Sequence, residues 1–470
     1  MKYRFLRIFL TIVAITAFSC SDGEDGEDGM DGVNGLNSGQ EFLVISGDVT
    51  DEEAVEIIEE TYGKNTSSIL IINTTNLTTL VLPEIETLVR LEIKNNQNLQ
   101  NLEIPSLKGV TDEVNISNNA ALTSVNIENL IGLEELTVEN NILLTSVNMS
   151  KLTVAEDINI EQNPLIQNIE LPSLKIVNDR LIIEKIESLS TLNLNNLETI
   201  DRLSIEDNEQ LTSINVQNLT VANNIRIGNV GLESFEAPEL IESENDIAFG
   251  SNSNLTTVLL PKLTTVGEIR FTRNELLSTI NISELASIRE RISLSDNTNL
   301  ETVSFPNVSS MTNVNIRIND NNSLTSISFP SLVSITKENR SVIIIIEDND
   351  MLTSVDFSNL ESFDANSFSI DADALDTVNF DSLTTFSILR VVSSSTLSAT
   401  KLSSIQDFDQ LSLETISTAD MDLLLAQLVR ITPAITGKNV RLRGAASAQA
   451  LTDAQTLRDN GNLVTISNPR

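Results

Sequence analysis

The stretch LTSVNI at residues 122–127 recurs in near copies along the chain: LTSVNM from Leu144, LTSINV from Leu211, LTSISF from Leu324 and LTSVDF from Leu352. In each copy the first, fourth and sixth residues are apolar, and the third and fifth are polar. Such alternation predicts a β-strand with one buried face. A second alternating pair later in the copy, such as Leu136 and Val138, predicts a second short strand.

The copies align on a leading aliphatic residue, and most leaders lie 22 or 23 residues apart, with one spacing of 28 after Leu324. We expect each copy to form one coil of two strands, stacked in parallel register at about 4.8 Å from its neighbour. Residues 77–410 are therefore predicted to form a solenoid of about fifteen coils. The leaders are Leu77, Leu99, Leu122, Leu144, Ile166, Leu189, Leu211, Leu232, Leu255, Leu277, Leu300, Leu324, Leu352, Leu375 and Leu397.

Asparagine and proline form two further columns in this alignment. Side-chain amides stacked at a turn can bond stranded backbone groups and one another, so we interpret the asparagines as structural. Proline at the end of a strand stops the ladder where the chain bends. The asparagines, three residues before the leader, are Asn96, Asn119, Asn141, Asn163, Asn208, Asn229, Asn252, Asn274, Asn297, Asn321 and Asn349; the prolines, six residues after it, are Pro83, Pro105, Pro172, Pro238, Pro261, Pro306 and Pro330.

The repeats resemble those of receptor L-domains and leucine-rich-repeat solenoids. Two stretches with these columns carry the resemblance: LTTLVLPEIETLVRLEIKNN at residues 77–96 and LTSISFPSLVSI at residues 324–335. Such solenoids include those of bacterial surface lipoproteins, and the resemblance covers about residues 77–405. It implies a mainly β fold: an elongated parallel β-solenoid with a small α/β cap at each end. It implies no particular ligand, because related solenoids serve different functions.

The caps are predicted outside the repeats, at residues 41–76 and 411–470. In the first, FLVISG indicates a strand and residues 50–62 a helix, with a capping box formed by Thr50 and Glu53 and a stop at Gly63. In the second, helical spacing at residues 420–429 precedes KNVRLRG, ALTDAQTLRDNG and LVTIS, which indicate a strand, a helix and a strand.

Residues 1–19 have the basic start and short apolar stretch of a signal peptide. Cys20, the only cysteine of the chain, lies where the segment resembles a bacterial lipoprotein signal, so we expect lipidation there rather than an ordinary signal peptide with an incidental thiol. Residues 20–40 contain an acidic Gly-x-y run, interpreted as a solvated tether and not as collagen. That run resembles the export signal of Bacteroidota-type lipoproteins, which implies a lipid anchor in the outer membrane, facing the exterior.

Composition restricts the function. The chain has no histidine and no tryptophan, which removes histidine-based catalysis and metal binding. Its net charge of −38 argues against nucleic acid as a partner, because a phosphate backbone requires a basic surface. Basic proteins, divalent cations and neutral polymers remain as partners. Catalysis by clustered carboxylates would need a long insertion that builds a cleft. The even spacing of the copies leaves room for such an insertion only near residues 336–341, in the longest copy.

Four glutamates form the most distinctive polar pattern. Glu139, Glu161, Glu184 and Glu206 occupy one outward position of the second strand in four successive copies. Carboxylates at this spacing repel one another, so the column is either solvated or covered by a cation such as Ca²⁺ or by a basic partner. No other cofactor is expected.

The phenylalanines of one inward column, Phe305, Phe329, Phe357 and Phe380, are interpreted as core rather than as a sugar platform. We expect a non-catalytic binding or adhesion module that binds a protein or polymer. A structural spacer is the alternative, and a calcium-dependent polysaccharide lyase or hydrolase the third.

Overall fold

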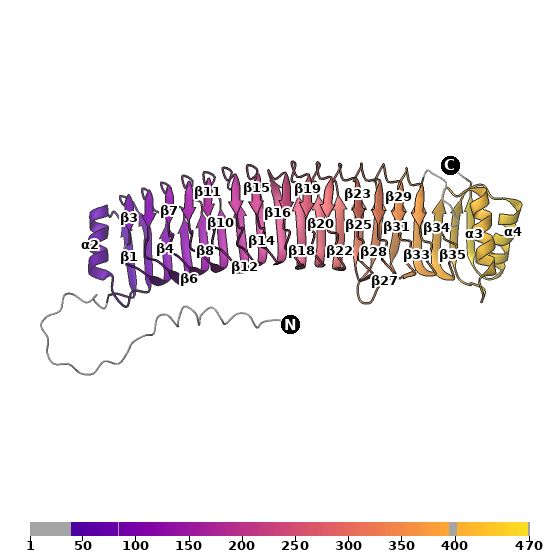
Figure 1. Ribbon diagram of the computed structural model, residues 1–470, viewed down its shortest axis with the longest axis horizontal. Coiled ribbons are helices and arrows are strands. Elements are labelled where there is room, and N and C mark those ends of the chain that lie inside the picture. Colours follow the sequence, from indigo (N-terminus) through magenta and orange to yellow (C-terminus); the bar gives the residue numbers. More distant parts are fainter. Residues whose placement is uncertain (1–38, 83, 394–401, 469–470) are drawn as a thin grey trace, which may run out of the picture.

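The computed structural model describes residues 39–82, 84–393 and 402–468. Stacked parallel strands form one long rod, with α2 (Asp51–Thr61) at one end and α3 (Thr418–Arg430) and α4 (Ala448–Asp459) at the other (Figure 1). The predicted parallel β-solenoid is therefore confirmed.

The larger side of the rod is a single 22-stranded parallel sheet, here called the main sheet. The second strand of each copy, predicted to be short, is the longer one in most coils, because it continues backwards through a β-bulge toward the preceding turn. In three successive coils, between residues 310 and 371, this strand is split in two. The strands of the main sheet are β1 (Phe42–Gly47), β2 (Ser68–Thr74), β4 (Thr87–Lys94), β6 (Gly109–Ser117), β8 (Gly132–Glu139), β10 (Val154–Glu161), β12 (Ile176–Glu184), β14 (Thr199–Asn208), β16 (Val221–Val230), β18 (Glu242–Gly250), β20 (Thr265–Thr272), β22 (Ser287–Ser295), β24 (Ser310–Thr312), β25 (Asn315–Asn319), β27 (Ser334–Thr336), β28 (Ile343–Glu347), β30 (Ser362–Phe363), β31 (Ser367–Asp371), β33 (Thr385–Val392), β34 (Asp407–Glu414), β35 (Asn439–Arg443) and β36 (Leu463–Ser467).

The opposite side consists of three-residue strands that contain the repeated phrase. They form sheets of five, two, three and four strands, so this side is interrupted where the main sheet is continuous. The short strands are β3 (Thr79–Val81), β5 (Asn101–Glu103), β7 (Ser124–Asn126), β9 (Ser146–Asn148), β11 (Asn168–Glu170), β13 (Thr191–Asn193), β15 (Ser213–Asn215), β17 (Ser234–Glu236), β19 (Thr257–Leu259), β21 (Thr279–Asn281), β23 (Thr302–Ser304), β26 (Ser326–Ser328), β29 (Ser354–Asp356) and β32 (Thr377–Asn379).

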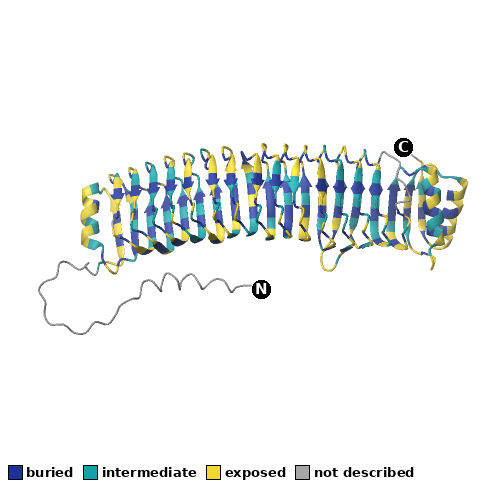
Figure 2. Ribbon diagram, viewed as in Figure 1, coloured by how far each residue is buried: buried dark blue, intermediate teal, exposed yellow. Residues whose placement is uncertain are grey.

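The apolar columns meet between the two sides in one continuous core. In the copy that begins at Leu122, the side chains of Leu122, Val125 and Ile127 are buried, as are Leu136 and Val138 of β8. Buried and exposed residues alternate along the strands of every coil in Figure 2. The predicted one-sided burial is thus confirmed.

The asparagine column forms a buried hydrogen-bonded ladder. Asn119 is fully buried; its Oδ1 accepts from the backbone N–H of Asn96 at 3.2 Å and from Asn96 Nδ2 at 2.8 Å. Its own Nδ2 donates to the Ile93 carbonyl at 2.8 Å and to Asn141 Oδ1 at 3.0 Å. Each side chain therefore satisfies backbone groups of a turn that water does not reach.

At one position of the predicted asparagine column the prediction is wrong. Asn229 is exposed, and Val230 takes the ladder position, with its N–H donating to Asn252 Oδ1 at 3.2 Å. The copy that begins at Leu211 has 21 residues, against 22 in the copy before it and 23 in the copy after it, and a residue is missing just after the ladder position. Gly231 permits this, because a Cβ there would lie 2.4 Å from the Glu209 carbonyl oxygen.

Residues with positive φ precede the ladder positions and were not foreseen. Asn95, Asn118, Asn140 and Asn229 have φ between 50° and 57°, and equivalent residues of other coils behave alike. Asparagine and aspartate adopt this left-handed conformation more readily than most residues, which explains their frequency here. Asn229 therefore belongs to this outer column.

The predicted phenylalanine column, formed by Phe305, Phe329, Phe357 and Phe380, is buried. Ring centroids of Phe305 and Phe329 are 4.7 Å apart, and those of Phe329 and Phe357 are 5.1 Å apart, with nearly parallel planes. A second stack runs through the main sheet, where Phe249 and Phe271 lie 5.3 Å apart. Both stacks are fully buried and belong to the core.

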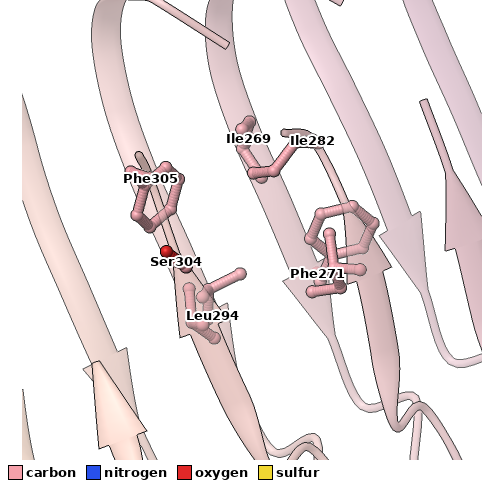
Figure 3. A pocket seen from close by; sticks show the side chains of 8 residues that line it. Ile269, Phe271, Ile282, Leu294, Ser304 and Phe305 are labelled. Carbon is pink, nitrogen blue, oxygen red and sulfur yellow. The ribbon is translucent and has the colours of Figure 1, made fainter. Parts of the chain in front are cut away.

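A small apolar cavity lies where one stack ends and the other begins (Figure 3). Phe271 and Phe305 face it from the two coils that flank a third, and this intervening coil contributes Ile282 and Leu294. That coil has no aromatic ring in either column, so its side chains underfill the space that phenylalanine fills on both sides. The interruption between the short strands β21 and β23 coincides with this defect.

We expect Ile282→Phe to fill the cavity and to raise the free energy of unfolding by about 1 kcal/mol. The same change in a closely packed aliphatic coil, Ile127→Phe, should instead destabilise by about 1–3 kcal/mol through overpacking. Chemical denaturation of both variants measures the difference. A loss of stability in Ile282→Phe as large as in Ile127→Phe would contradict the explanation of the cavity.

Both ends contribute strands to the same main sheet. The strands expected at FLVISG, KNVRLRG and LVTIS are β1, β35 and β36, and the expected helices are α2, α3 and α4. The capping box is confirmed, with Thr50 N–H donating to Glu53 Oε2 at 2.9 Å and Glu53 N–H to Thr50 Oγ1 at 3.3 Å.

Three details at the ends differ from expectation or lie outside the described residues. β34 runs across the expected boundary at 410/411, so the solenoid continues into the second cap. Helix α2 ends with Tyr62 in an extended conformation, and Gly63 has no positive φ. Three predictions lie outside the described residues: the last leader, Leu397; the proline at Pro83; and the segment 1–38, which contains Cys20.

Candidate functional site

The structure brings the four predicted glutamates together. Glu139 lies opposite Glu161, Glu161 opposite Glu184, and Glu184 opposite Glu206, on the neighbouring strands β8, β10, β12 and β14. All four side chains point outward from the main sheet and are partly exposed. The column is therefore a real feature of one face of the rod.

Local donors reduce the repulsion within this glutamate column. Glu139 Oε1 accepts from Asn140 Nδ2 at 3.0 Å, and Glu206 Oε1 accepts from Ser204 Oγ at 3.0 Å. Glu184 pairs with Lys185, and this carboxylate raises the pKa of the Lys185 ammonium group. The column is thus partly neutralised by its own chain, although the Lys185–Glu184 ion pair is exposed to solvent and weak.

Two more acidic columns lie at the other end of the same strands. Glu113, Glu135 and Asp157 are in register on β6, β8 and β10. Asp112, Glu134 and Glu156 each precede one of them at the bulge. Sequence reasoning missed these columns, although acidic pairs at residues 112–113, 134–135 and 156–157 repeat with the period of the coils.

Burial and mutual repulsion perturb this second group. Desolvation raises the pKa of the Glu135 carboxyl, and the charges of Glu113 and Asp157 raise it further. Desolvation, followed by the charge of Glu134, likewise raises the pKa of Glu156. Clustered carboxylates with raised pKa values mark a place where negative charge is held at an energetic cost.

Arginines bound the second group at both ends. Arg90 donates to Asp112 Oδ2 at 2.7 Å, and Arg180 Nε lies 2.5 Å from Asp157 Oδ1. Desolvation outweighs the pairing with Arg180, so the pKa of Asp157 is raised as well. The three acidic columns on strands β6 to β14 are called the acidic face.

The raised pKa values predict how stability depends on pH. Ionised Glu135 and Glu156 are less favourable in the folded than in the unfolded chain. Lowering the pH through their raised folded pKa values toward 4.5, the ordinary pKa of a glutamate, should therefore increase stability. Glu135→Gln with Glu156→Gln should melt higher than wild type at pH 7 and show a smaller gain on acidification. Calorimetry between pH 7 and pH 5 measures this.

A matched control places the same changes on the short-strand side, with Glu103→Gln and Glu170→Gln, which are exposed and far from the acidic face. This control should follow the wild-type pH dependence. Equal pH profiles for the two double variants would contradict the assignment.

Among the described residues, no group of three or more aspartate, glutamate, histidine or cysteine side chains is arranged to hold a metal ion. Calcium binding at Glu139, Glu161, Glu184 and Glu206 therefore stays a prediction. The loop after β27, the one predicted place for a cleft, is held by ion pairs from Lys337 to Asp364 at 3.2 Å and from Arg340 to Glu290 at 3.9 Å.

The outward face of the short strands differs from the acidic face. It consists mostly of serine, threonine and asparagine, and hydroxyls next to these strands bond backbone carbonyls of the preceding coil. Thr145 Oγ1, for example, donates to the Thr123 carbonyl at 2.9 Å. The two sides of the rod are therefore chemically unlike.

Comparison with known proteins adds little to this description. No protein-family model matches the chain, and no curated protein matches it. Among solved structures, the chain is similar to a leucine-rich repeat protein from Bacteroides ovatus ATCC 8483, with 13% sequence identity, 68% of this chain and 86% of that chain covered, and a TM-score of 0.31. At these values the likeness carries no argument about function, and the fold assignment rests on strand register and burial.

Proposed function

We propose that this leucine-rich-repeat-like solenoid is a cell-surface lipoprotein that acts as a non-catalytic binding or adhesion module. The difference between its two sides carries the proposal. A spacer without a ligand needs only a uniform surface, whereas here charge is concentrated on strands β6 to β14 of one face. Burial, and after it the charges of neighbouring carboxylates, raises the pKa of Glu135 and of Glu156, and such perturbed groups are more frequent at binding sites than on ordinary surfaces.

The chemistry of the acidic face favours a basic protein as its ligand. Carboxylates in three columns attract a basic surface and steer its approach, and the association should weaken steeply with salt. The alternative, a structural envelope protein without a specific ligand, predicts no salt-dependent partner.

Capture from intact cells tests the binding role. The full chain carrying Cys20→Ser, immobilised and incubated with the cells or their surface extract, should retain a basic protein at low salt and release it at high salt. A second bait with Glu134→Gln, Glu135→Gln and Glu156→Gln should lose this partner. Retention of the same proteins by both baits would favour nonspecific adsorption, and no salt-dependent partner would favour the spacer.

The membrane role rests on residues 1–40 and has its own test. Among the described residues, no helix is long and apolar enough to span a membrane. If acyl chains on Cys20 anchor the protein, Cys20→Ser should move it from the membrane fraction to the soluble fraction, because burial of the acyl chains supplies the attachment. Immunoblots of both fractions measure this, and retention of the variant in the membrane would contradict lipidation.

Digestion by protease added to intact cells would separately support exposure at the outer face. Protection until the outer membrane is broken would instead place the protein on the periplasmic side.

A further inference from the structure

Consecutive turns of the rod expose an apolar patch that the turns themselves do not require. The turn at residues 141–144 is closed by a hydrogen bond of 3.0 Å from the Leu144 N–H to the Asn141 carbonyl. Ile142 and Leu143 occupy its two central positions, and their side chains are 57% and 44% exposed. Turns favour glycine, proline, asparagine, aspartate and serine, so turn formation does not explain two large apolar residues here.

The neighbouring turns continue the patch in both directions. The next turn holds Pro164 and Leu165 at the same positions, and Leu165 is 42% exposed. The ladder bond from the Asn141 N–H to Asn163 Oδ1, at 2.9 Å, keeps these two turns in register. The preceding turn holds two alanines there. The six residues, here called the apolar ridge, are Ala120, Ala121, Ile142, Leu143, Pro164 and Leu165.

Most other coils are polar at these positions. Ser253 and Asn254 form one such pair, and isolated apolar residues occur at Leu276 and Met351, each next to an acidic residue. Single exposed apolar residues are normal on a protein surface, whereas a contiguous apolar patch with a polar rim marks an interaction site. The apolar ridge therefore distinguishes one short part of the rod.

The apolar ridge borders the glutamate column. Glu139 lies three residues before Ile142, and Glu161 lies three residues before Pro164, so the two members of each pair are at most about 11 Å apart. Both glutamates are partly exposed and in register on β8 and β10. Apolar turns and stacked carboxylates thus coincide in the same coils.

We propose that the apolar ridge and the glutamate column together bind a basic amphipathic helix of a partner protein; this rests on the proposed function and adds the element that is bound. The helix lies along the rod, with apolar side chains on Ile142, Leu143 and Leu165 and with lysines or arginines on Glu139 and Glu161.

Charge excludes a second copy of this chain as the source of the helix. The three described helices, α2, α3 and α4, each contain more acidic than basic residues. Against the glutamate column they would place like charges opposite each other, which opposes association. The ligand is therefore a different, basic chain.

Dimensions favour a helix over an added strand. A helix is about 10–12 Å across, enough to cover the apolar ridge and the glutamate column together, and its rise of about 5.4 Å per turn is close to the spacing of about 4.8 Å between coils. One apolar and one basic side chain per turn can thus meet each coil. An added strand needs a free sheet edge, whereas β8 is paired on both sides, with β6 and β10.

A model peptide tests the site. The probe is a labelled lysine–leucine peptide of about 18 residues, long enough to form a helix, with leucines on one face and lysines on the other. Fluorescence anisotropy measures its binding to the full chain carrying Cys20→Ser, which prevents association through acyl chains. A second peptide of the same composition, scrambled so that it has no apolar face, should bind at least about tenfold more weakly.

Two variants remove the two halves of the site separately. Ile142→Ser with Leu143→Asn and Leu165→Asn, which introduces residues found in equivalent turns, should weaken binding at least about tenfold at every salt concentration, because apolar burial is lost. Glu139→Gln with Glu161→Gln should weaken binding at low salt and flatten its salt dependence.

The matched control for the apolar ridge is Leu276→Asn with Met351→Asn, which removes exposed apolar residues from isolated positions and should bind the peptide like the parent chain. Circular dichroism confirms that each variant is folded. Equal affinities of the ridge variant and this control, or no binding of the amphipathic peptide by the parent chain, would overturn the proposal.

The scrambled peptide separates this inference from the proposed function. If the parent chain binds both peptides equally, and Glu134→Gln with Glu135→Gln and Glu156→Gln abolishes both, the acidic face attracts basic chains and the apolar ridge has no role. That result overturns this inference alone. Binding of neither peptide, together with no salt-dependent partner from cells, contradicts both.

Discussion

Replacing Asn119 with alanine should lower the free energy of unfolding by about 3–5 kcal/mol, a large part of the stability of an ordinary domain. The side chain makes four hydrogen bonds in a fully buried turn, two as acceptor and two as donor. Without it, the N–H groups of Asn96 and the carbonyl of Ile93 remain buried and unpaired. Each such group costs about 1–3 kcal/mol.

Chemical denaturation and hydrogen exchange should be combined to measure this loss. Each coil contacts only its neighbours, so unfolding need not be a single transition, and exchange should increase most in the coils around Asn119. The matched control is Asn129→Ala in the next copy, where a partly exposed side chain donates to the Pro105 carbonyl and accepts from Lys151 Nζ. If the two variants lost equal stability, the ladder would not be the source of the effect.

Phe329→Ala should destabilise the chain by about 3–5 kcal/mol. The ring is fully buried and stacks on Phe305 at 8° and on Phe357 at 5°, so its removal opens a cavity and breaks two aromatic contacts. Phe329→Leu, which keeps most of the apolar volume, should cost clearly less. Denaturation midpoints of the two variants give the comparison, and equal losses would show that ring stacking and cavity size contribute little.

These two predictions show how much of the structure a repeated sequence allows one to predict. Asn119 and Phe329 could be placed because each recurs at one position of a fixed period, and identical coils make identical contacts. The prediction failed at Asn229, where a copy one residue shorter puts Val230 in the ladder. A deletion of this size is visible in the sequence, but its place within the turn depends on which backbone groups remain paired.

The candidate site was predictable only in part. The glutamate column at Glu139 to Glu206 was found because each glutamate comes directly after the last inward residue of its strand, where the alternation is regular and the next position must face outward. The columns at Glu135 and Glu156 were missed because they lie at the bulge, where the alternation that identifies outward positions breaks down. Their raised pKa values result from desolvation by neighbouring coils, which no single copy contains.

The coil period, the one-sided burial of the strands, the ladder and the stacked rings could all be read from the amino-acid sequence, because each of them repeats a local pattern. Which strand of each coil is long, where the short-strand side is interrupted and where the cavity between Phe271 and Phe305 lies could be seen only in the folded chain. These features arise between coils that differ from one another, so they depend on register and packing along the whole rod.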